Sequence, residues 1–180
     1  MYKRQTIYAS GARVELILNG RSLGKKKVKE GKAIFKNVKY IPGKIEAVNL
    51  DATGKEIGRT ALQSATGNTI LKLEAEKKQL RPNGQDLCFI ELSLVGENGI
   101  LKMNADTEIS VQISGAGTLQ GFGSAVPNTE NSFISGIYTT YRGRALIAVR
   151  AGYEEGEIHV SVSTDGISEQ TISIQVKGEE

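Results

Sequence analysis

His159 and Cys88 are the side chains with the most reactive chemistry, and each is the single residue of its type among the 180 in the chain. A nucleophilic triad needs a basic histidine beside a serine or cysteine, and no G-x-S-x-G pattern accompanies His159. His159 also alternates with Ile158 and Val160, which places its side chain opposite the apolar face of a strand, toward solvent. A lone histidine without nearby Cys or His residues is a poor metal ligand. We therefore predict no histidine-dependent catalysis, no metal site and no cofactor.

Two pairs of carboxylates, Asp106 with Glu108 and Glu154 with Glu155, have a spacing that could support general acid–base catalysis. Each pair lies in a polar, turn-like stretch, where carboxylates are usually solvated. The glycine-rich run at 115–121 resembles a dinucleotide-binding loop only superficially, because the glycine spacing is wrong and no helical pattern follows it. We interpret these features as surface charges and a tight turn between strands, so no catalytic residue is predicted.

Aromatic and guanidinium side chains gather between residues 133 and 144. Sugar-binding sites combine rings that stack on pyranose faces with polar groups that bind hydroxyls. Phe133 and the candidate carbohydrate-binding residues Tyr138, Tyr141, Arg142 and Arg144 offer both. However, aromatic residues near strand starts often pack into the core, and the chain has no Trp and only 6% aromatic residues. Both interpretations, a sugar-binding face and core packing, stay open.

The elements that would position these groups are β-strands, because apolar and polar residues alternate with a period of two through most of the chain. Val14, Leu16 and Leu18 form one such run, and the Asn19-Gly20 pair that ends it is typical of a hairpin turn. Similar runs lie at 33–38, 45–50, 56–62, 71–75, 87–95, 109–113, 145–151, 157–163 and 171–176. No amphipathic helix separates them, so we predict an all-β fold of two tandem immunoglobulin-like antiparallel β-sandwiches.

The run at 87–95 predicts a core face made of Cys88, Ile90, Leu92 and Leu94. Cys88 is then a small buried hydrophobic residue, since no neighbouring cation would lower the pKa of its thiol. A single cysteine allows no internal disulfide. Because no apolar run approaches the roughly 18 residues needed to span a bilayer, no membrane span is predicted.

Charge divides the chain near residue 67. Residues 1–67 contain 14 Lys and Arg against 5 Asp and Glu, a net charge of +9, whereas residues 68–180 contain 9 against 15, a net charge of −6. Small polar residues without a pattern occupy 64–69, as is typical of a linker. We therefore predict two domains, a small β-sandwich at 1–66 and a second sandwich at 67–180.

The most basic stretch of the chain contains Lys25, Lys26, Lys27 and Lys29. A basic patch can bind nucleic acid, but no aromatic residue is interleaved here for base stacking. Lysines also protect an edge strand from pairing with other sheets. We predict a solvated edge strand and no nucleic-acid partner.

Several stretches resemble the domains that follow the catalytic barrel in glycoside hydrolase family 2, the family of bacterial β-galactosidases. The segment VELILNGRSLGKK, from Val14 to Lys26, is similar to the β-sandwich after the barrel, as are 40–48 and 51–60. The segments 83–87, 115–117, 121–125 and 139–146 are similar to a bacterial immunoglobulin-like module that comes next, although Asn83 stands where the family often has Asp. Residues 1–5 match nothing in the family and resemble a translated sequencing adaptor. We therefore expect the first strand to begin at about Ile7.

The resemblance implies a non-catalytic C-terminal accessory region of a β-galactosidase-like enzyme. The two catalytic Glu residues of the family lie on the barrel, so they carry over onto no position of this sequence. The implied partner is the upstream barrel of the same polypeptide, and the implied location is the periplasm or the outside of the cell. Two alternatives stay open, namely a carbohydrate-binding module that targets the enzyme to a polysaccharide and a cell-surface adhesion spacer.

Overall fold

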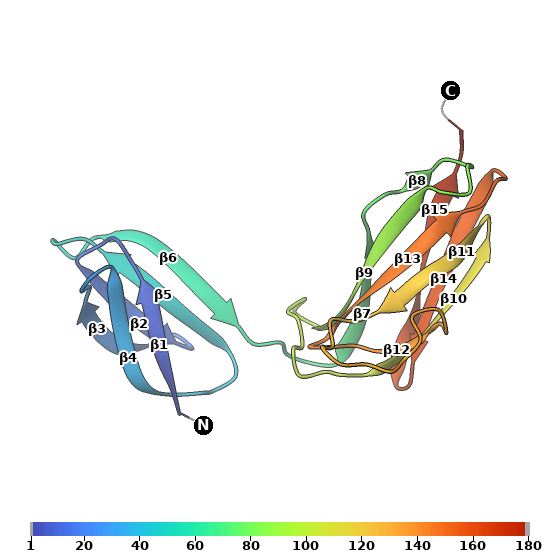
Figure 1. The fold of residues 1–180 in the computed structure, drawn as a ribbon. Coiled ribbons are helices and arrows are strands. Elements are labelled where there is room, and N and C mark those ends of the chain that lie inside the picture. The colour runs from blue at the N-terminus through green and yellow to red at the C-terminus, as the bar shows by residue number, and fades with distance from the viewer. Residues whose placement is uncertain (1, 179–180) are drawn as a thin grey trace. The chain divides into compact units, whose positions relative to one another are not determined.

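A computed structural model describes residues 2–178, and every regular element among them is a β-strand (Figure 1). The chain divides into two compact units, of which one ends at Thr66 and the other begins at Gly67. Within the described residues there is no helix long and apolar enough to cross a membrane. The all-β class expected from the period of two is confirmed.

The first unit contains six strands in two layers: β1 (Tyr2–Tyr8), β2 (Arg13–Leu18), β3 (Arg21–Lys27), β4 (Lys32–Lys39), β5 (Lys44–Leu50) and β6 (Glu56–Gln63). One layer is a four-stranded sheet in the order β3-β2-β5-β6, and the other is the antiparallel pair β1-β4. Their apolar faces meet in a small core of Val14, Leu16, Ala33, Phe35, Val38 and Ala47. The predicted hairpin is confirmed, because Asn19 and Gly20 join β2 to β3 with positive φ angles of 49° and 79°.

The expected start of the first strand at about Ile7 is wrong. β1 begins at Tyr2, and its residues pair with β4 from Tyr2 opposite Lys39 to Tyr8 opposite Lys32. The side chains of residues 2–4 are exposed and do not alternate in polarity. Strand pairing uses backbone groups, which every residue carries, so this part of the strand left no side-chain pattern in the sequence.

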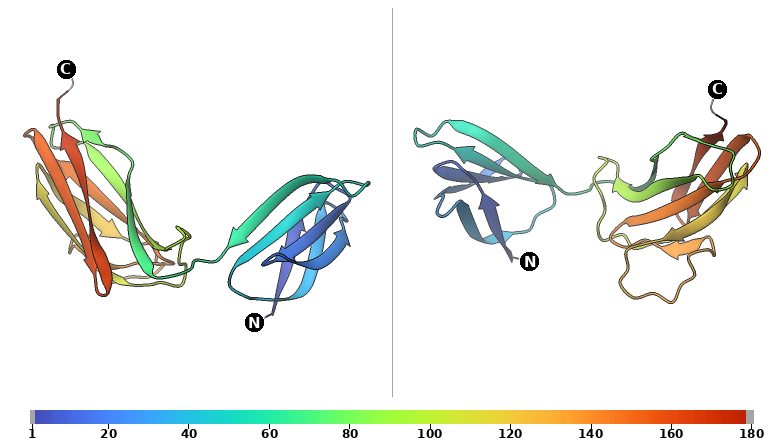
Figure 2. Two further views of the ribbon diagram at one scale, coloured as in Figure 1. Left: turned by 180° about the vertical axis from the view of Figure 1, so that it is seen from behind. Right: turned by 45° about the horizontal axis from the view of Figure 1, so that its top comes forward.

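The second unit contains nine strands: β7 (Thr69–Ala75), β8 (Gln79–Leu80), β9 (Leu87–Gly96), β10 (Glu108–Gly115), β11 (Gly117–Gly123), β12 (Ile137–Thr139), β13 (Arg144–Ala151), β14 (Gly156–Thr164) and β15 (Ile167–Val176). They form one sheet in the order β12-β10-β14-β15-β8 and a second in the order β11-β13-β9-β7. Every pairing is antiparallel except that of β8 with β15. Figure 2 shows this unit from two further directions.

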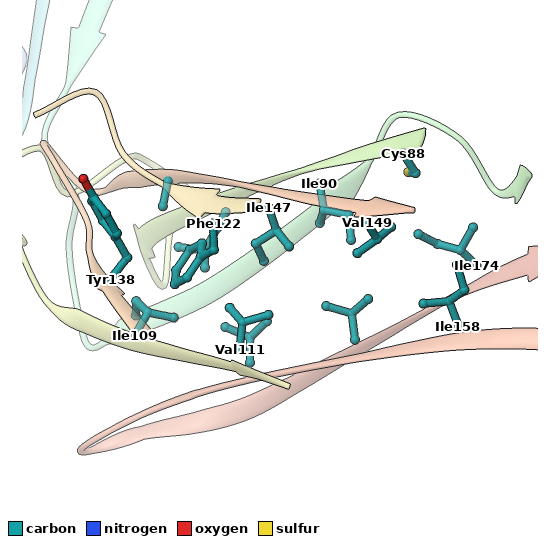
Figure 3. Packing of buried hydrophobic residues seen from close by; sticks show 14 of the residues in the cluster. Cys88, Ile90, Ile109, Val111, Phe122, Tyr138, Ile147, Val149, Ile158 and Ile174 are labelled. Atoms are coloured by element: carbon teal, nitrogen blue, oxygen red, sulfur yellow. The ribbon is translucent and has the colours of Figure 1, made fainter. Parts of the chain in front are cut away.

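The two sheets of the second unit enclose a core of alternating side chains (Figure 3). Cys88, Ile90, Leu92 and Leu94 of β9 are all 0% exposed, which confirms the predicted core face. Facing and neighbouring strands contribute further completely buried residues, namely Ile109, Ile147, Val149, Ile158, Val160, Val162 and Ile174. Burial raises the pKa of the Cys88 thiol, as expected for a core residue.

The glycine-rich run at 115–121 contains the predicted tight turn. It also contains most of β11, a strand that the sequence pattern did not predict. Ala116 alone separates β10 from β11, and these strands belong to different sheets. Gly115 has a φ of +89°, and a Cβ there would lie 2.0 Å from the carbonyl oxygen of Glu157. A side chain is therefore excluded at this crossing. Because β11 contains three glycines, its alternation was too weak to indicate a strand.

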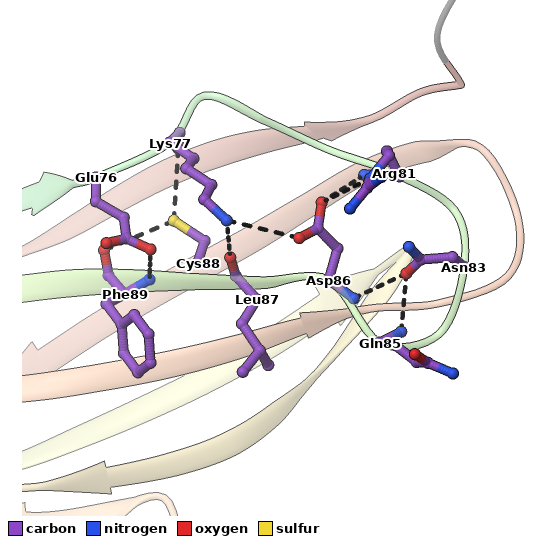
Figure 4. A network of polar contacts seen from close by, with 9 residues as sticks. All are labelled: Glu76, Lys77, Arg81, Asn83, Gln85, Asp86, Leu87, Cys88 and Phe89. Carbon is purple, nitrogen blue, oxygen red and sulfur yellow. Dashed lines mark hydrogen bonds and ion pairs between the residues drawn. The ribbon is translucent and has the colours of Figure 1, made fainter.

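A polar network closes the connection between β8 and β9 (Figure 4). Asn83 Oδ1 accepts hydrogen bonds from the backbone N–H groups of Gln85 (2.9 Å) and Asp86 (2.8 Å). The Asp86 carboxylate accepts the backbone N–H of Arg81 at 3.1 Å, and this bond, together with the nearby Lys77 ammonium, lowers the pKa of Asp86. Asn83 thus supplies the acceptor oxygen that this turn requires.

Adjacent residues of β13 test the importance of this core. Ile147 is 0% exposed, whereas Leu146 is 48% exposed. We expect Ile147→Ala to lower the free energy of unfolding of the second unit by about 2–5 kcal/mol, because it leaves a cavity between the sheets. Leu146→Ala should cost less than about 1 kcal/mol. Urea unfolding followed by circular dichroism measures both, and equal losses would contradict the observed register.

Candidate functional site

An apolar groove of about 760 Å³ lies on the outer face of the β11-β13-β9-β7 sheet. Its floor is formed by Leu146 and Ala148 of β13 and by Gly121 and Gly123 of β11, which are paired across the two strands. Leu146 and Ala148 face outward because Ile147, which lies between them on β13, faces the core. Leu101, Met103, Ser124, Ala125, Phe133, Tyr141 and Arg142 line its sides.

The glycines of β11 keep the groove open. A Cβ at Gly121 would meet nothing closer than 3.9 Å, so the backbone there is exposed to the groove. A Cβ at Gly123 would lie 2.5 Å from Cδ1 of Phe133, whose ring rests on the bare backbone. The Phe133 residue remains 51% exposed. The groove therefore presents an accessible aromatic ring, and on the β11 side its floor is bare backbone.

Tyr138 does not lie on the surface with the other candidate residues. It is 2% exposed and belongs to the core, because β12 pairs it with the buried Ile109 of β10. Its ring stacks on Phe133 with centroids 5.4 Å apart. It also meets Phe122 edge-on, with centroids 6.1 Å apart (Figure 3). No face of Tyr138 is left for a sugar ring. Of the two interpretations of this residue, core packing is the one that its burial supports.

Tyr141, Arg142 and Arg144 do line the groove, and a tight turn holds them there. Tyr141 and Arg144 exchange backbone hydrogen bonds of 2.9 and 3.1 Å across Arg142 and Gly143, which both have positive φ angles. The Arg142 guanidinium lies 5.3 Å from the centre of the Tyr141 ring. The backbone N–H of Arg142 donates to Asp106 Oδ1 at 2.7 Å and fixes the turn. A ring and two guanidinium groups thus share one side of the groove.

Glu91 is a polar groove residue that the sequence analysis missed. It forms an ion pair and hydrogen bond with Arg144, and both side chains are about half exposed. The alternation in β9 places Glu91 outward, between the buried Ile90 and Leu92, but the pairing of β9 with β13 was needed to place it beside Arg144. Among the described residues lining the groove, Glu91 is the one carboxylate. Hydrolysis of a glycoside uses two.

Two of the four candidate acids have structural contacts instead, and none of the four lines the groove. Asp106 fixes the turn at Arg142, and Glu155 Oε1 accepts the backbone N–H of Gly178 at 2.8 Å. His159 is exposed on β14, as predicted, and its Nδ1 lies 3.0 Å from the Ser173 hydroxyl. Within residues 2–178, no three His, Cys, Asp or Glu side chains converge on a point that could hold a metal ion.

Two family models match the chain. One, described as glycoside hydrolase family 2 C-terminal domain 5, matches residues 71–173, which is more than half of the chain. The other, described as a domain of unknown function (DUF4982), matches residues 5–58.

Individual relatives are similar over nearly the whole chain. A β-galactosidase from Bacteroides ovatus is 23% identical over 171 residues, which are 94% of this chain and 20% of that protein. The solved structure of a glycosyl hydrolase family 2 member from Bacteroides cellulosilyticus matches with a TM-score of 0.88 at 31% identity, covering 97% of this chain and 23% of its own. A β-glycosidase from Bacteroides vulgatus matches with a TM-score of 0.80 at 27% identity, covering 97% and 22%. The chain therefore spans about a fifth of the length of these relatives.

Two substitutions test the placement of Tyr138. Its hydroxyl is buried and has no hydrogen-bond partner among the residues that the structure describes. We therefore expect Tyr138→Phe to leave the free energy of unfolding unchanged or to raise it, because an unpaired buried polar group is removed. Tyr138→Ala should lower it by about 3–5 kcal/mol, as for other large core residues. Urea unfolding measures both. A Tyr138→Ala variant as stable as the wild type would contradict core packing.

Proposed function

Since the chain belongs to the C-terminal domains of glycoside hydrolase family 2, we propose that it is the non-catalytic accessory region of a β-galactosidase-like enzyme. The catalytic barrel lies upstream in the same polypeptide in this proposal and hydrolyses O-glycosyl bonds in β-galactosides. The match to a β-galactosidase from Bacteroides ovatus over 94% of this chain supports that activity for the parent. Such an enzyme meets its substrate in the periplasm or outside the cell.

The observation that carries the proposal is the distribution of ionisable groups. The apolar groove on the second unit is lined by a single carboxylate among the described residues, and Arg144 is already paired with it. Retaining glycosidases place two carboxyl groups about 5–5.5 Å apart. Among its described lining residues, this groove lacks the carboxylate pair that would cleave a glycosidic bond.

A second function, carbohydrate binding, is favoured by the contents of the same groove. The exposed ring of Phe133 and the side chain of Leu146 offer apolar surface to one face of a pyranose. Arg144 and Glu91 offer a donor and an acceptor for sugar hydroxyls, and Tyr141 with Arg142 offers a ring and a second cation. We assign Tyr141, Arg142 and Arg144 as the carbohydrate-binding residues, without Tyr138.

Both functions are tested with the purified full chain in one set of assays. A chromogenic β-galactoside measures hydrolysis, and affinity electrophoresis through gels that contain galactan measures binding. We expect no hydrolysis above the blank, retardation of the wild type by galactan, and affinity about tenfold lower for Tyr141→Ala, a loss of about 1.4 kcal/mol. Tyr153→Ala is the matched control, because Tyr153 is 81% exposed and lies outside the groove.

Each assay has an outcome that contradicts one of the two functions. Hydrolysis above the blank would contradict the accessory role. Equal mobility of the wild type in gels with and without galactan would contradict galactan binding. Equal loss of retardation in Tyr141→Ala and Tyr153→Ala would show that the ring of Tyr141 has no specific part in it.

A further inference from the structure

We propose that the first unit binds an anionic polysaccharide, one whose sugars carry carboxylate or sulfate groups, through a lysine-rich edge. This lysine edge consists of Lys25, Lys26, Lys27, Lys29 and Lys32, which line one hollow of about 580 Å³. The proposal rests on the proposed function, in which the chain belongs to an enzyme that hydrolyses β-galactosides. It concerns the part of the chain that matches a domain of unknown function, and it uses none of the groove residues of the second unit.

The lysines come from both layers of the first unit. Lys25, Lys26 and Lys27 lie on β3, the outermost strand of the four-stranded sheet, and all seven residues of β3 are exposed. Lys32 begins β4, which belongs to the other layer, and Lys29 lies in the connection. If these lysines only protected the edge strand β3 from pairing with another sheet, they would be needed on β3 alone. The convergence of two layers on one hollow instead concentrates positive potential at a single place.

Four of the five lysines form no ion pair with the residues that the structure describes. Glu30 is the one carboxylate that lines the hollow among the described residues, and Lys25 forms an ion pair with Glu15 at 3.5 Å. In the part of the chain that the structure describes, no carboxylate oxygen lies within 4.0 Å of the ammonium groups of Lys26, Lys27, Lys29 or Lys32.

The remaining acids of the first unit are engaged elsewhere. Glu46 pairs with Lys44 and Arg59, and Glu56 pairs with Arg59. Asp51 accepts hydrogen bonds from the turn that it begins. These acids leave most of the charge of the lysine edge uncompensated, so an external polyanion can neutralise it and release its own counterions.

Aromatic contacts favour a sugar chain as the polyanion. The Lys32 ammonium lies 5.5 Å from the centre of the Tyr8 ring, and Tyr8 is 74% exposed. The Lys26 ammonium lies 5.6 Å from the ring of the buried Phe35, so its stem is held against the core. An exposed ring beside Lys32, which itself lines the hollow with four other lysines, suits a charged sugar, because such a sugar needs one stacking face and several anion contacts. Single-stranded nucleic acid is usually bound by successive rings that stack successive bases.

The test measures binding of the full chain to polygalacturonate, to dextran sulfate and to neutral dextran by affinity electrophoresis. The triple variant K26Q/K27Q/K29Q removes three charges from the lysine edge. The control K55Q/K72Q/K78Q removes the same charge from exposed positions outside the hollow. The double variant K27Q/K29Q keeps the packed Lys26 and serves if the triple variant unfolds, which circular dichroism detects.

We expect retardation by at least one of the two polyanions and none by neutral dextran. The triple variant should bind about tenfold more weakly and the control less than about twofold more weakly, and the affinity should fall steeply between 50 and 300 mM salt. Polygalacturonate and dextran sulfate distinguish carboxylate from sulfate recognition.

Three outcomes would overturn the proposal. Equal losses in the triple variant and the control would mean that net charge alone attracts the polyanion. No retardation by either polyanion would mean that the lysine edge binds neither. Tighter binding of single-stranded DNA or of phosphatidylserine vesicles at the same salt would assign the lysine edge to a different partner. Hydrolysis and galactan binding are measured on the same triple variant. These two assays test the proposed function independently of the lysine edge.

Discussion

The layer of buried apolar side chains between the two sheets of residues 67–178 is the constraint on which the candidate site depends. Because side chains alternate along a strand, each buried residue fixes the direction of its neighbours. Ile147 in the core places Leu146 and Ala148 in the groove, and the burial of Ile90 and Leu92 turns Glu91 toward Arg144. The core therefore fixes not only the stability of the second unit but also the arrangement of its outer face.

Most strands and the core face of β9 could be predicted, because a two-residue period and turn residues such as Asn19-Gly20 are local signals. Features that depend on pairing partners could not. Glu91 lies 53 positions from Arg144, and only the alignment of β9 with β13 brings them together. Tyr138 lies on a strand of three residues after a long polar loop, too short to show an alternation, and its pairing with Ile109 buries it.

The side chains of this chain that are available for binding lie on its surface. Its lone thiol is buried, and its lone histidine and the acids Asp106 and Glu155 have structural contacts. Two surfaces carry exposed groups suited to binding a ligand, and they differ in chemistry. One is an apolar groove with a ring and guanidinium groups, and the other is a hollow with uncompensated lysines. Because the chain belongs to glycoside hydrolase family 2, we propose carbohydrates as the ligands of both surfaces and assign the reaction to a barrel elsewhere in the parent protein.

The two β units each enclose a core of their own. Limited proteolysis of the full chain, followed by mass spectrometry, tests whether each unit folds on its own. We expect the first cuts to fall between Ser64 and Asn68, where no strand is formed, and to leave two resistant fragments. Resistance of this segment, or digestion of both units together without stable fragments, would contradict it.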